Sequence, residues 1–272
     1  VEEYIQKPYG SILLTGPTGS GKTTTLYSIL RKINDETVNI ITLEDPIEIL
    51  LPGINQSQIQ EEIGYTFASG LRSILRQDPD IIMVGEIRDS DTANLATHAS
   101  LTGHLVFSTL HTNDSIGVIP RLIDLGVEKY LIAPTLNLAI AQRLLRKLCP
   151  SCKKKSKPNS AEEKIIRDGV RAMPEEARKD LDLSKIVIYR ASEEGCSECR
   201  GKAFKGRIAI FEILEITDQV EKIVLSGLSE AALREEAERQ GMLTMFQDGL
   251  LKVMGGIVSL EELFEVAEAG NA

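Results

Sequence analysis

The chain has 272 residues, 42% of them hydrophobic and 26% charged, so it can bury a substantial core and has the composition of an ordinary globular protein. Its net charge of −9 argues against a protein that grips nucleic acid non-specifically, because such a protein needs a basic face. The sequence contains no apolar run of the roughly 18 residues that a membrane-spanning helix requires. The chain begins at Val1 rather than at a methionine, and we expect it to be part of a longer protein.

A glycine-rich loop near the start of the chain predicts a nucleotide site. An apolar run at residues 12–14 predicts a buried strand, and the loop with the pattern Gly-x-x-x-x-Gly-Lys-Thr separates it from an amphipathic helical stretch. We expect the backbone N–H groups of this loop to surround a triphosphate, with Lys22 reaching the β- and γ-phosphates and the Thr23 hydroxyl binding Mg²⁺. The alternative, a chance glycine loop, is disfavoured by the flanking strand and helix. The predicted nucleotide-binding residues are Gly16, Pro17, Thr18, Gly19, Ser20, Gly21, Lys22, Thr23 and Thr24.

A second buried strand is predicted at residues 38–43, and it ends in two acids, Glu44 and Asp45. In parallel α/β sheets ligands bind beyond the carboxyl ends of the strands, so these carboxylates are expected on the nucleotide side. A carboxylate there can orient a water for attack on the γ-phosphate, and the alternative is a solvated strand end. The alternating glutamines that follow at Gln56, Gln58 and Gln60 are interpreted as an exposed edge segment.

A third strand is predicted at residues 81–86, after an amphipathic helix that starts at Phe67 and stops at Asp78-Pro79. Asp80 enters this strand and Glu86 leaves it, so the two acids are about 20 Å apart at about 3.3 Å per residue. Only Glu86 lies at the phosphate end, where we expect it to hold Mg²⁺ through water or to activate water. A plain surface acid is the alternative.

The three histidines, His98, His104 and His111, fall within one short region. Residues 90–101 are predicted as a helix with Ser90 as its N-cap, and residues 105–109 as a fourth strand. His111 follows the carboxyl end of that strand, where it can sense phosphate or stabilise the active site. His104 lies at the other end, where a role at a subunit boundary is possible, and His98 is interpreted as structural. Residues 114–126 and 134–148 are predicted to be helical.

Four cysteines form two Cys-x-x-Cys pairs, typical of a structural zinc site with four thiolate ligands and no open position. Disulfides or unconnected thiols are the alternatives. The stretch between the two pairs is also longer than the usual spacing of a zinc-knuckle motif. The predicted ligands are Cys149, Cys152, Cys196 and Cys199. The remaining predictions are a capping box at residues 160–163, a strand at 206–214, and helices at 220–225, 231–240, 246–254 and 259–268.

The order of these motifs resembles that of the bacterial secretion ATPases that drive type II secretion and type IV pilus assembly. The resemblance covers nearly the whole chain, and in the terms of that family the motifs are similar to its Walker A, Asp, Walker B and His boxes. The matching stretches are residues 16–27, Glu44-Asp45-Pro46-Ile47-Glu48, Leu75-Arg76-Gln77-Asp78-Pro79-Asp80 running into Gly85-Glu86-Ile87-Arg88-Asp89, Thr102-Gly103-His104 and Thr109-Leu110-His111-Thr112-Asn113. The cysteine pairs resemble the zinc module of the secretion and pilus-assembly branches of this family. The pilus-retraction ATPases lack that module, so a motor that extends a pilus is favoured over one that retracts it.

The resemblance implies an α/β fold with a RecA-like P-loop core at residues 1–147, a tetracysteine zinc module at 148–205 and a mainly helical C-terminal subdomain at 206–272. It implies a homohexameric cytoplasmic ATPase that uses ATP, Mg²⁺ and Zn²⁺ and binds an inner-membrane platform protein. Carried over by position, Lys22 and Thr23 bind phosphate and Mg²⁺, Glu44 polarises water, and Glu86 supports the Mg²⁺. His104 and His111 match the His box. Catalysis is thus expected from Lys22, Glu44, Glu86 and His111.

The family also has a separate N-terminal domain that supplies arginines to the nucleotide of a neighbouring subunit, and the sequence does not include it. We therefore expect the chain alone to bind ATP but to hydrolyse it slowly, because an arginine in trans can be worth several powers of ten in rate. Two other functions stay open. A nucleic-acid translocase or recombinase on the same core is disfavoured by the negative net charge of the chain, so no direct nucleic-acid contact is expected. A non-hydrolysing scaffold is disfavoured by Glu44, Glu86 and the His box.

Overall fold

The computed structural model describes residues 1–267 and divides into two compact units. The first contains Val1–Ala141 with Leu214–Ala237, and the second contains Gln142–Ile213 with the segment from Glu238 onward. This grouping differs from the three predicted domains, 1–147, 148–205 and 206–272. The predicted C-terminal subdomain is divided, because its first helix packs in the first unit and its last two helices pack in the second. No helix within residues 1–267 is long and apolar enough to cross a membrane.

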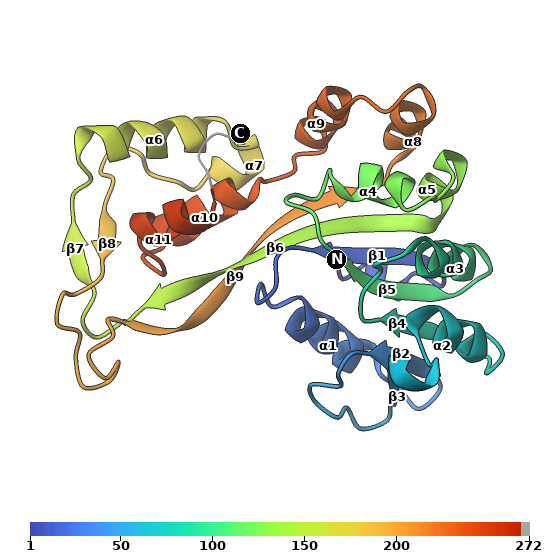
Figure 1. Cartoon of the computed structure of the whole chain (residues 1–272). Coiled ribbons are helices and arrows are strands. Elements are labelled where there is room, and N and C mark those ends of the chain that lie inside the picture. The colour runs from blue at the N-terminus through green and yellow to red at the C-terminus, as the bar shows by residue number, and fades with distance from the viewer. Residues whose placement is uncertain (268–272) are drawn as a thin grey trace. The chain divides into compact units, whose positions relative to one another are not determined.

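A seven-stranded sheet has the strand order β3-β2-β4-β5-β1-β6-β9 (Figure 1). Its first five strands in this order lie in the first unit, together with residues 136–141 of β6 and 214–215 of β9. The pairs β1–β5, β1–β6, β2–β3, β2–β4 and β4–β5 are all parallel. Every residue of β1, β2, β4 and β5 is buried, which explains why these strands are largely apolar in sequence. The strands are β1 (Gly10–Thr15), β2 (Ile40–Glu44), β3 (Asn55–Gln58), β4 (Ile81–Val84), β5 (Leu105–Leu110), β6 (Leu136–Leu148) and β9 (Phe204–Glu215).

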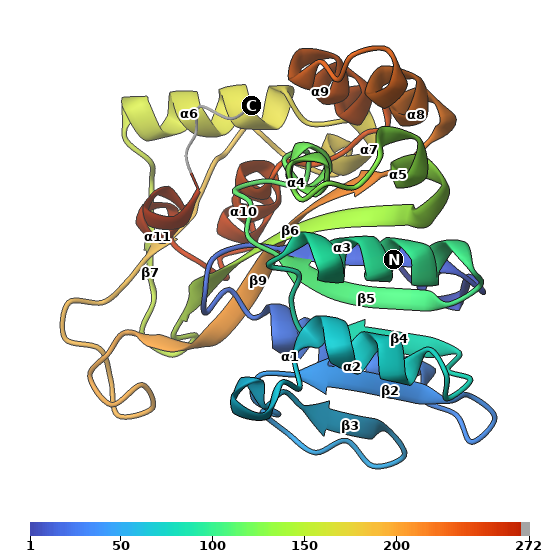
Figure 2. The same ribbon diagram turned by 45° about the vertical axis from the view of Figure 1, so that its right-hand side comes forward.

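Helices cover both faces of this sheet. The chain runs from β1 to β2 in one direction along the strand order, and from β3 through β4 and β5 to β6 in the other. Because such crossovers are right-handed, α1 lies on one face and α2, α3 and α5 lie on the opposite face, where α8 packs against α5 (Figure 2). The helices of this unit are η1 (Tyr4–Gln6), α1 (Lys22–Ile33), η2 (Glu61–Ile63), α2 (Phe67–Ile74), α3 (Ser90–Leu101), α4 (Val118–Asp124), α5 (Lys129–Thr135), α8 (Asp218–Leu225) and most of α9 (Glu230–Arg239).

The predicted helix at 134–148 is wrong, because residues 136–148 form strand β6. Leu136, Leu138 and Ile140 alternate along this segment and are buried, and β6 pairs with β1 from Ser11 to Thr15. The larger apolar residues of this segment also fit a helical period, so the sequence pattern is ambiguous and the open edge of β1 decides between the two structures.

Two predicted helix starts are displaced by one residue. Asp89 rather than Ser90 caps α3, because its side chain accepts the N–H of Thr92. Asn159 forms the capping box of α6 with Glu162. The helix predicted at 259–268 is α11, described as ending at Val266, and its predicted last residue, Glu268, lies outside the described residues.

The second unit has its own apolar core beneath its helices. Ile166 and Val170 of α6 pack in this core with Phe246, Leu250 and Leu263 from the C-terminal segment. Gly169 allows close contact between α6 and α10, because a Cβ atom there would lie 2.4 Å from the Leu250 side chain. The elements are β7 (Lys154–Ser156), α6 (Ser160–Arg171), α7 (Glu175–Arg178), β8 (Ile188–Arg190), α10 (Met245–Met254) and α11 (Leu260–Val266), with β7 and β8 antiparallel.

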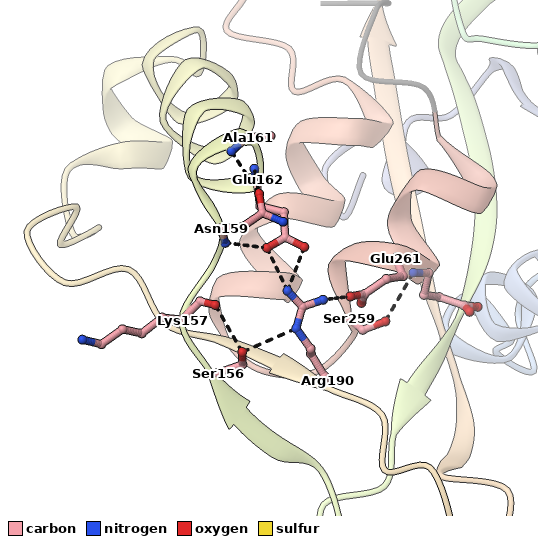
Figure 3. Close-up of polar contacts among 9 residues, drawn as sticks. Ser156, Lys157, Asn159, Ala161, Glu162, Arg190, Ser259 and Glu261 are labelled. Atoms are coloured by element: carbon pink, nitrogen blue, oxygen red, sulfur yellow. Dashed lines mark hydrogen bonds and ion pairs between the residues drawn. The ribbon is translucent and has the colours of Figure 1, made fainter.

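Arg190, at the end of β8, connects three elements of this unit (Figure 3). Its Nη2 donates to both carboxylate oxygens of Glu162 at 2.8 Å, its Nη1 donates to Glu261 of α11, and its Nε donates to Ser156 of β7 at 3.4 Å. Burial of the Glu162 carboxylate opposes its ionisation, but the hydrogen bonds from Arg190 and from the Asn159 N–H outweigh burial and lower its pKa. The cluster therefore stabilises the second unit while Glu162 is ionised.

We predict that Arg190→Gln lowers the free energy of unfolding by about 2 kcal/mol at neutral pH, because the largely buried Glu162 carboxylate loses its partner. The folded-state pKa of Glu162 is below the unfolded value, so this stabilisation is present at neutral pH and is lost as the pH falls through the folded-state pKa. Urea unfolding of wild type and variant at neutral and acidic pH measures the difference, which should shrink in acid.

The matched control is Arg167→Gln, which removes an i,i+4 pair with the half-exposed Glu163 on the same helix and should cost about 0.5 kcal/mol or less. Equal losses in the two variants would contradict a special role for Arg190.

Candidate functional site

The carboxyl ends of β1, β2, β4 and β5 meet at one edge of the parallel sheet. The glycine-rich loop follows β1, Glu44 ends β2, Glu86 lies two residues after β4, and His111 directly follows β5. The fold thus brings the predicted catalytic positions to one edge of the sheet. This edge includes a topological switch point, because the chain crosses from β1 toward β2 on one side of the sheet order and from β5 toward β6 on the other. Asp80 lies at the opposite edge, where its carboxylate accepts the Asn39 N–H at 2.7 Å.

The glycine-rich loop has the backbone geometry of an anion-binding loop. Gly16, Gly19 and Gly21 have positive φ values of 147°, 79° and 87°, which favour glycine. Helix α1 begins at Lys22 directly after the loop, so the N–H groups of its first turn lie at a positive dipole end. The Lys22 ammonium donates to the carbonyl oxygens of Gly16 and Pro17 at 2.8 and 3.1 Å, which holds its charge over the loop. The loop can therefore hold a phosphate group.

Thr15 connects the start of this loop to the segment after β5. Its hydroxyl lies 2.7 Å from the Thr112 hydroxyl, and it accepts the Thr112 N–H at 2.7 Å. The Thr112 hydroxyl in turn lies within 2.8 Å of the Asp114 carbonyl, and Arg234 of α9 pairs with the Asp114 carboxylate at 3.2 Å. The His111 segment is therefore fixed to the phosphate-loop strand on one side and to α9 on the other.

Glu44 is only 2% exposed and accepts hydrogen bonds from three side chains. Its Oε2 accepts from the Tyr27 hydroxyl, and its Oε1 accepts from Thr42 at 2.5 Å and from the Gln56 amide at 2.9 Å. Burial and the bond to Glu44 raise the pKa of Tyr27 to about 12, so this phenol keeps its proton and remains a donor at neutral pH. These donors satisfy the oxygens of a buried carboxylate at the end of β2.

Glu86 lies between two cationic or potentially cationic groups. Its Oε1 accepts from Arg88 at 2.5 Å, and its Oε2 lies 3.4 Å from Nε2 of His111. The hydrogen bond to Glu86 raises the pKa of the Arg88 guanidinium, which keeps Arg88 charged. An acid at this edge can bind a divalent cation directly or through water. Of the other histidines, His104 contacts the Ala99 carbonyl at the opposite end of β5, and His98 is exposed on α3.

Tyr27, Thr42 and Gln56 are site residues that the sequence analysis missed. The segment that contains Gln56 is an edge strand as predicted, since β3 is the outermost strand and is partly exposed. The Gln56 side chain nevertheless reaches from β3 across to Glu44 of the parallel neighbour β2. No sequence pattern separates Gln56 from Gln58, because both fit the same alternation.

The four cysteines come together in the second unit as free thiols, with their sulfur atoms within 4.8 Å of one another. The Sγ atoms are 3.7 Å apart for Cys149 and Cys196, 3.8 Å for Cys152 and Cys199, and 3.7 Å for Cys196 and Cys199. Four sulfurs at about 2.3 Å from a tetrahedral zinc ion lie about 3.8 Å apart, so the arrangement fits such an ion.

Backbone donors favour thiolate at this cluster. Burial opposes ionisation of Cys199, but its Sγ accepts the N–H groups of Cys196 and Ala203 at 3.1 and 3.2 Å, and its pKa falls to about 6. Burial and the hydrogen bonds of the neighbouring thiols raise the pKa of Cys152 to about 12. A metal ion would replace the protons that the sulfurs otherwise share.

Comparison with known proteins gives consistent matches over the whole chain. Residues 1–265 match a family model described as Type II/IV secretion system protein. The chain is 48% identical to the type IV pilus assembly ATPase PilB of Myxococcus xanthus over 263 residues, which are 96% of this chain and 44% of that protein. It is 46% identical to the type II secretion system ATPase E of Vibrio cholerae over 267 residues, which are 97% of this chain and 50% of that protein.

Among solved structures, the pilus retraction motor PilT with bound ADP superposes with a TM-score of 0.70 at 30% identity, covering 98% of this chain and 63% of that one. The chain thus spans about half the length of the curated relatives that it matches.

Proposed function

Because the chain belongs to the Type II/IV secretion system protein family, we propose that it is the ATP-hydrolysing portion of a motor that powers assembly of a type IV pilus or of a type II secretion pseudopilus. The observation that carries this proposal is the convergence of the glycine-rich loop, Glu44 and Glu86 at one edge of the sheet. The names of the relatives favour assembly and secretion, and the mostly parallel sheet shared with PilT supports a motor core.

Each residue has a distinct role in this proposal. The loop N–H groups and Lys22 bind the β- and γ-phosphates of ATP. Thr23 and Glu86 would hold Mg²⁺, which would neutralise phosphate charge. Glu44 accepts a hydrogen bond from the attacking water, and His111 keeps the Glu86 carboxylate in place from the opposite side to Arg88.

The proposed partners follow from the family. We infer a homo-oligomer, a hexamer, in which an N-terminal domain of a neighbouring subunit adds arginines to the nucleotide. The motor would act in the cytoplasm, bound to the inner membrane through a platform protein. Because the core is proposed to need these arginines, activity is best measured on the complete natural protein.

We predict that Lys22→Ala and Glu86→Gln in the complete natural protein lower kcat for ATP hydrolysis by at least about tenfold. Lys22→Ala removes a positive charge from the phosphates, and Glu86→Gln removes an anionic ligand of the Mg²⁺ that would neutralise them. Lys22→Ala should also weaken ATP binding. A phosphate-release assay and a fluorescent nucleotide titration measure the two effects.

The control is Asp80→Asn, which changes an acid at the other end of the same strand and should leave kcat within about twofold. Wild-type turnover in Glu86→Gln would contradict the assigned role. Stimulation of turnover by DNA or RNA would instead favour a translocase.

We also propose that the four cysteines hold a structural Zn²⁺ that stabilises the second unit. We predict one zinc ion per chain by elemental analysis, and its loss together with a lower melting temperature in Cys152→Ser or Cys196→Ser. Ser197→Ala, in the same loop, is the control and should keep the metal. A cysteine variant that retains full zinc content would refute the site.

The cellular role is tested by deleting the gene and examining surface pili by electron microscopy and secreted proteins in the medium. Loss of pili with normal secretion is expected for a pilus-assembly motor, and loss of secreted proteins with intact pili is expected for a type II secretion motor. No change in either, with no paralogue to compensate, would contradict both.

A further inference from the structure

We propose that Tyr27 and Gln56 are positioning residues for Glu44, which they hold in a fixed orientation for ATP hydrolysis. The inference rests on the proposed role of Glu44 in orienting the attacking water. Tyr27 ends the stretch that matches the Walker A box but lies beyond the predicted nucleotide-binding residues 16–24, and Gln56 lies outside the acidic motifs. Each acts through Glu44 rather than on ATP.

The donors around Glu44 leave it little freedom. A carboxylate offers about four lone-pair sites, and three of them are used here. Two on Oε1 are used by Thr42 and Gln56, and one on Oε2 is used by Tyr27. By this count one site remains, on Oε2, and the Tyr27 hydroxyl determines how that oxygen is oriented toward a water.

The three donors come from three different elements. Tyr27 belongs to α1, Thr42 to β2 itself and Gln56 to the edge strand β3. Thr42 moves with the strand that carries Glu44, whereas Tyr27 ties the carboxylate to helix α1 and Gln56 ties it to the adjacent strand β3. A carboxylate held from three elements is fixed more tightly than one that is held by its own strand alone.

Tyr27 and Gln56 also hold the segment that follows Glu44. The Tyr27 oxygen accepts the Glu48 N–H at 3.2 Å. The Gln56 amide accepts the Leu51 N–H at 2.6 Å and donates to the Ile49 carbonyl at 3.1 Å. The carboxylate and the segment from Glu48 to Leu51 are therefore fixed by the same two side chains.

The position of Tyr27 in α1 also connects Glu44 to the proposed phosphate site. Helix α1 begins at Lys22, the proposed phosphate ligand, and Tyr27 lies on the same helix with only 3% of its surface exposed. One rigid helix thus carries both the lysine that binds the phosphates and the phenol that orients Glu44. The distance between phosphate and water-orienting acid is set by helix geometry rather than by a flexible loop.

The test measures kcat and KM for ATP in the complete natural protein for Tyr27→Phe, Gln56→Met and Glu44→Gln, and for each of the first two combined with Glu44→Gln. We expect Tyr27→Phe and Gln56→Met each to lower kcat about tenfold, the size of one lost hydrogen bond to a charged group, with KM changed less than about twofold. In the Glu44→Gln background neither should lower kcat further, because the group that they orient is already gone.

Two substitutions serve as matched controls. Tyr130→Phe changes a tyrosine that is 62% exposed on α5, and Gln58→Met changes the next glutamine on the same face of β3, which makes a longer contact of 3.4 Å to the Ile47 N–H. Both should keep kcat within about twofold. Thermal melting identifies any variant that fails to fold, and because Tyr27 and Gln56 lie on separate elements, either one alone tests the inference.

The outcomes distinguish the inference from its premise. Wild-type kcat in Glu44→Gln would show that the proposed role of Glu44 is wrong. A low kcat in Glu44→Gln with wild-type values in Tyr27→Phe and Gln56→Met would overturn the positioning role alone. So would reductions that persist in full in the Glu44→Gln background, since they would reflect packing rather than orientation of Glu44.

Discussion

The parallel direction of the central strands determines where the polar chemistry of the first unit lies. A buried parallel strand has mostly apolar side chains along its length, so charged groups collect where the strand ends. Because β1, β2, β4 and β5 all end at the same edge, the phosphate loop, Glu44, Glu86 and His111 come together there although they are far apart in the sequence. An antiparallel neighbour would have sent its terminal acid to the opposite edge, where Asp80 lies.

Burial of a charged group imposes the second constraint. Glu44 is only 2% exposed, so its carboxylate oxygens need hydrogen-bond donors from the protein. Those donors must come from residues that surround the end of β2, which explains why a tyrosine of α1 and a glutamine of β3 both turn toward it. Glu86, at 16% exposure, is less enclosed and is instead paired with Arg88 and close to His111.

The sequence alone predicts the α/β class, the central strands and the acids at their ends, since buried parallel strands and a phosphate loop have strong local patterns. Strand β6 is not predicted, because Ile140, Leu144 and Leu145 fit a helix as well as a strand and only the open edge of β1 separates the two. The donors to Glu44 are also not predicted. Their contacts join residues distant in sequence, and a glutamine on an exposed edge has no local signal for a role in the interior.

The spacing of the cysteine pairs has a consequence for the unfolded chain. Cys149 and Cys196 are 47 positions apart, so a metal ion held by both pairs would close a long loop in the way that a covalent cross-link does. By the usual estimate for a cross-link of this span, the lost conformational entropy of the unfolded state is worth about 4 kcal/mol. The second unit would then derive part of its stability from the concentration of free metal around it, and its folding would respond to metal supply independently of nucleotide.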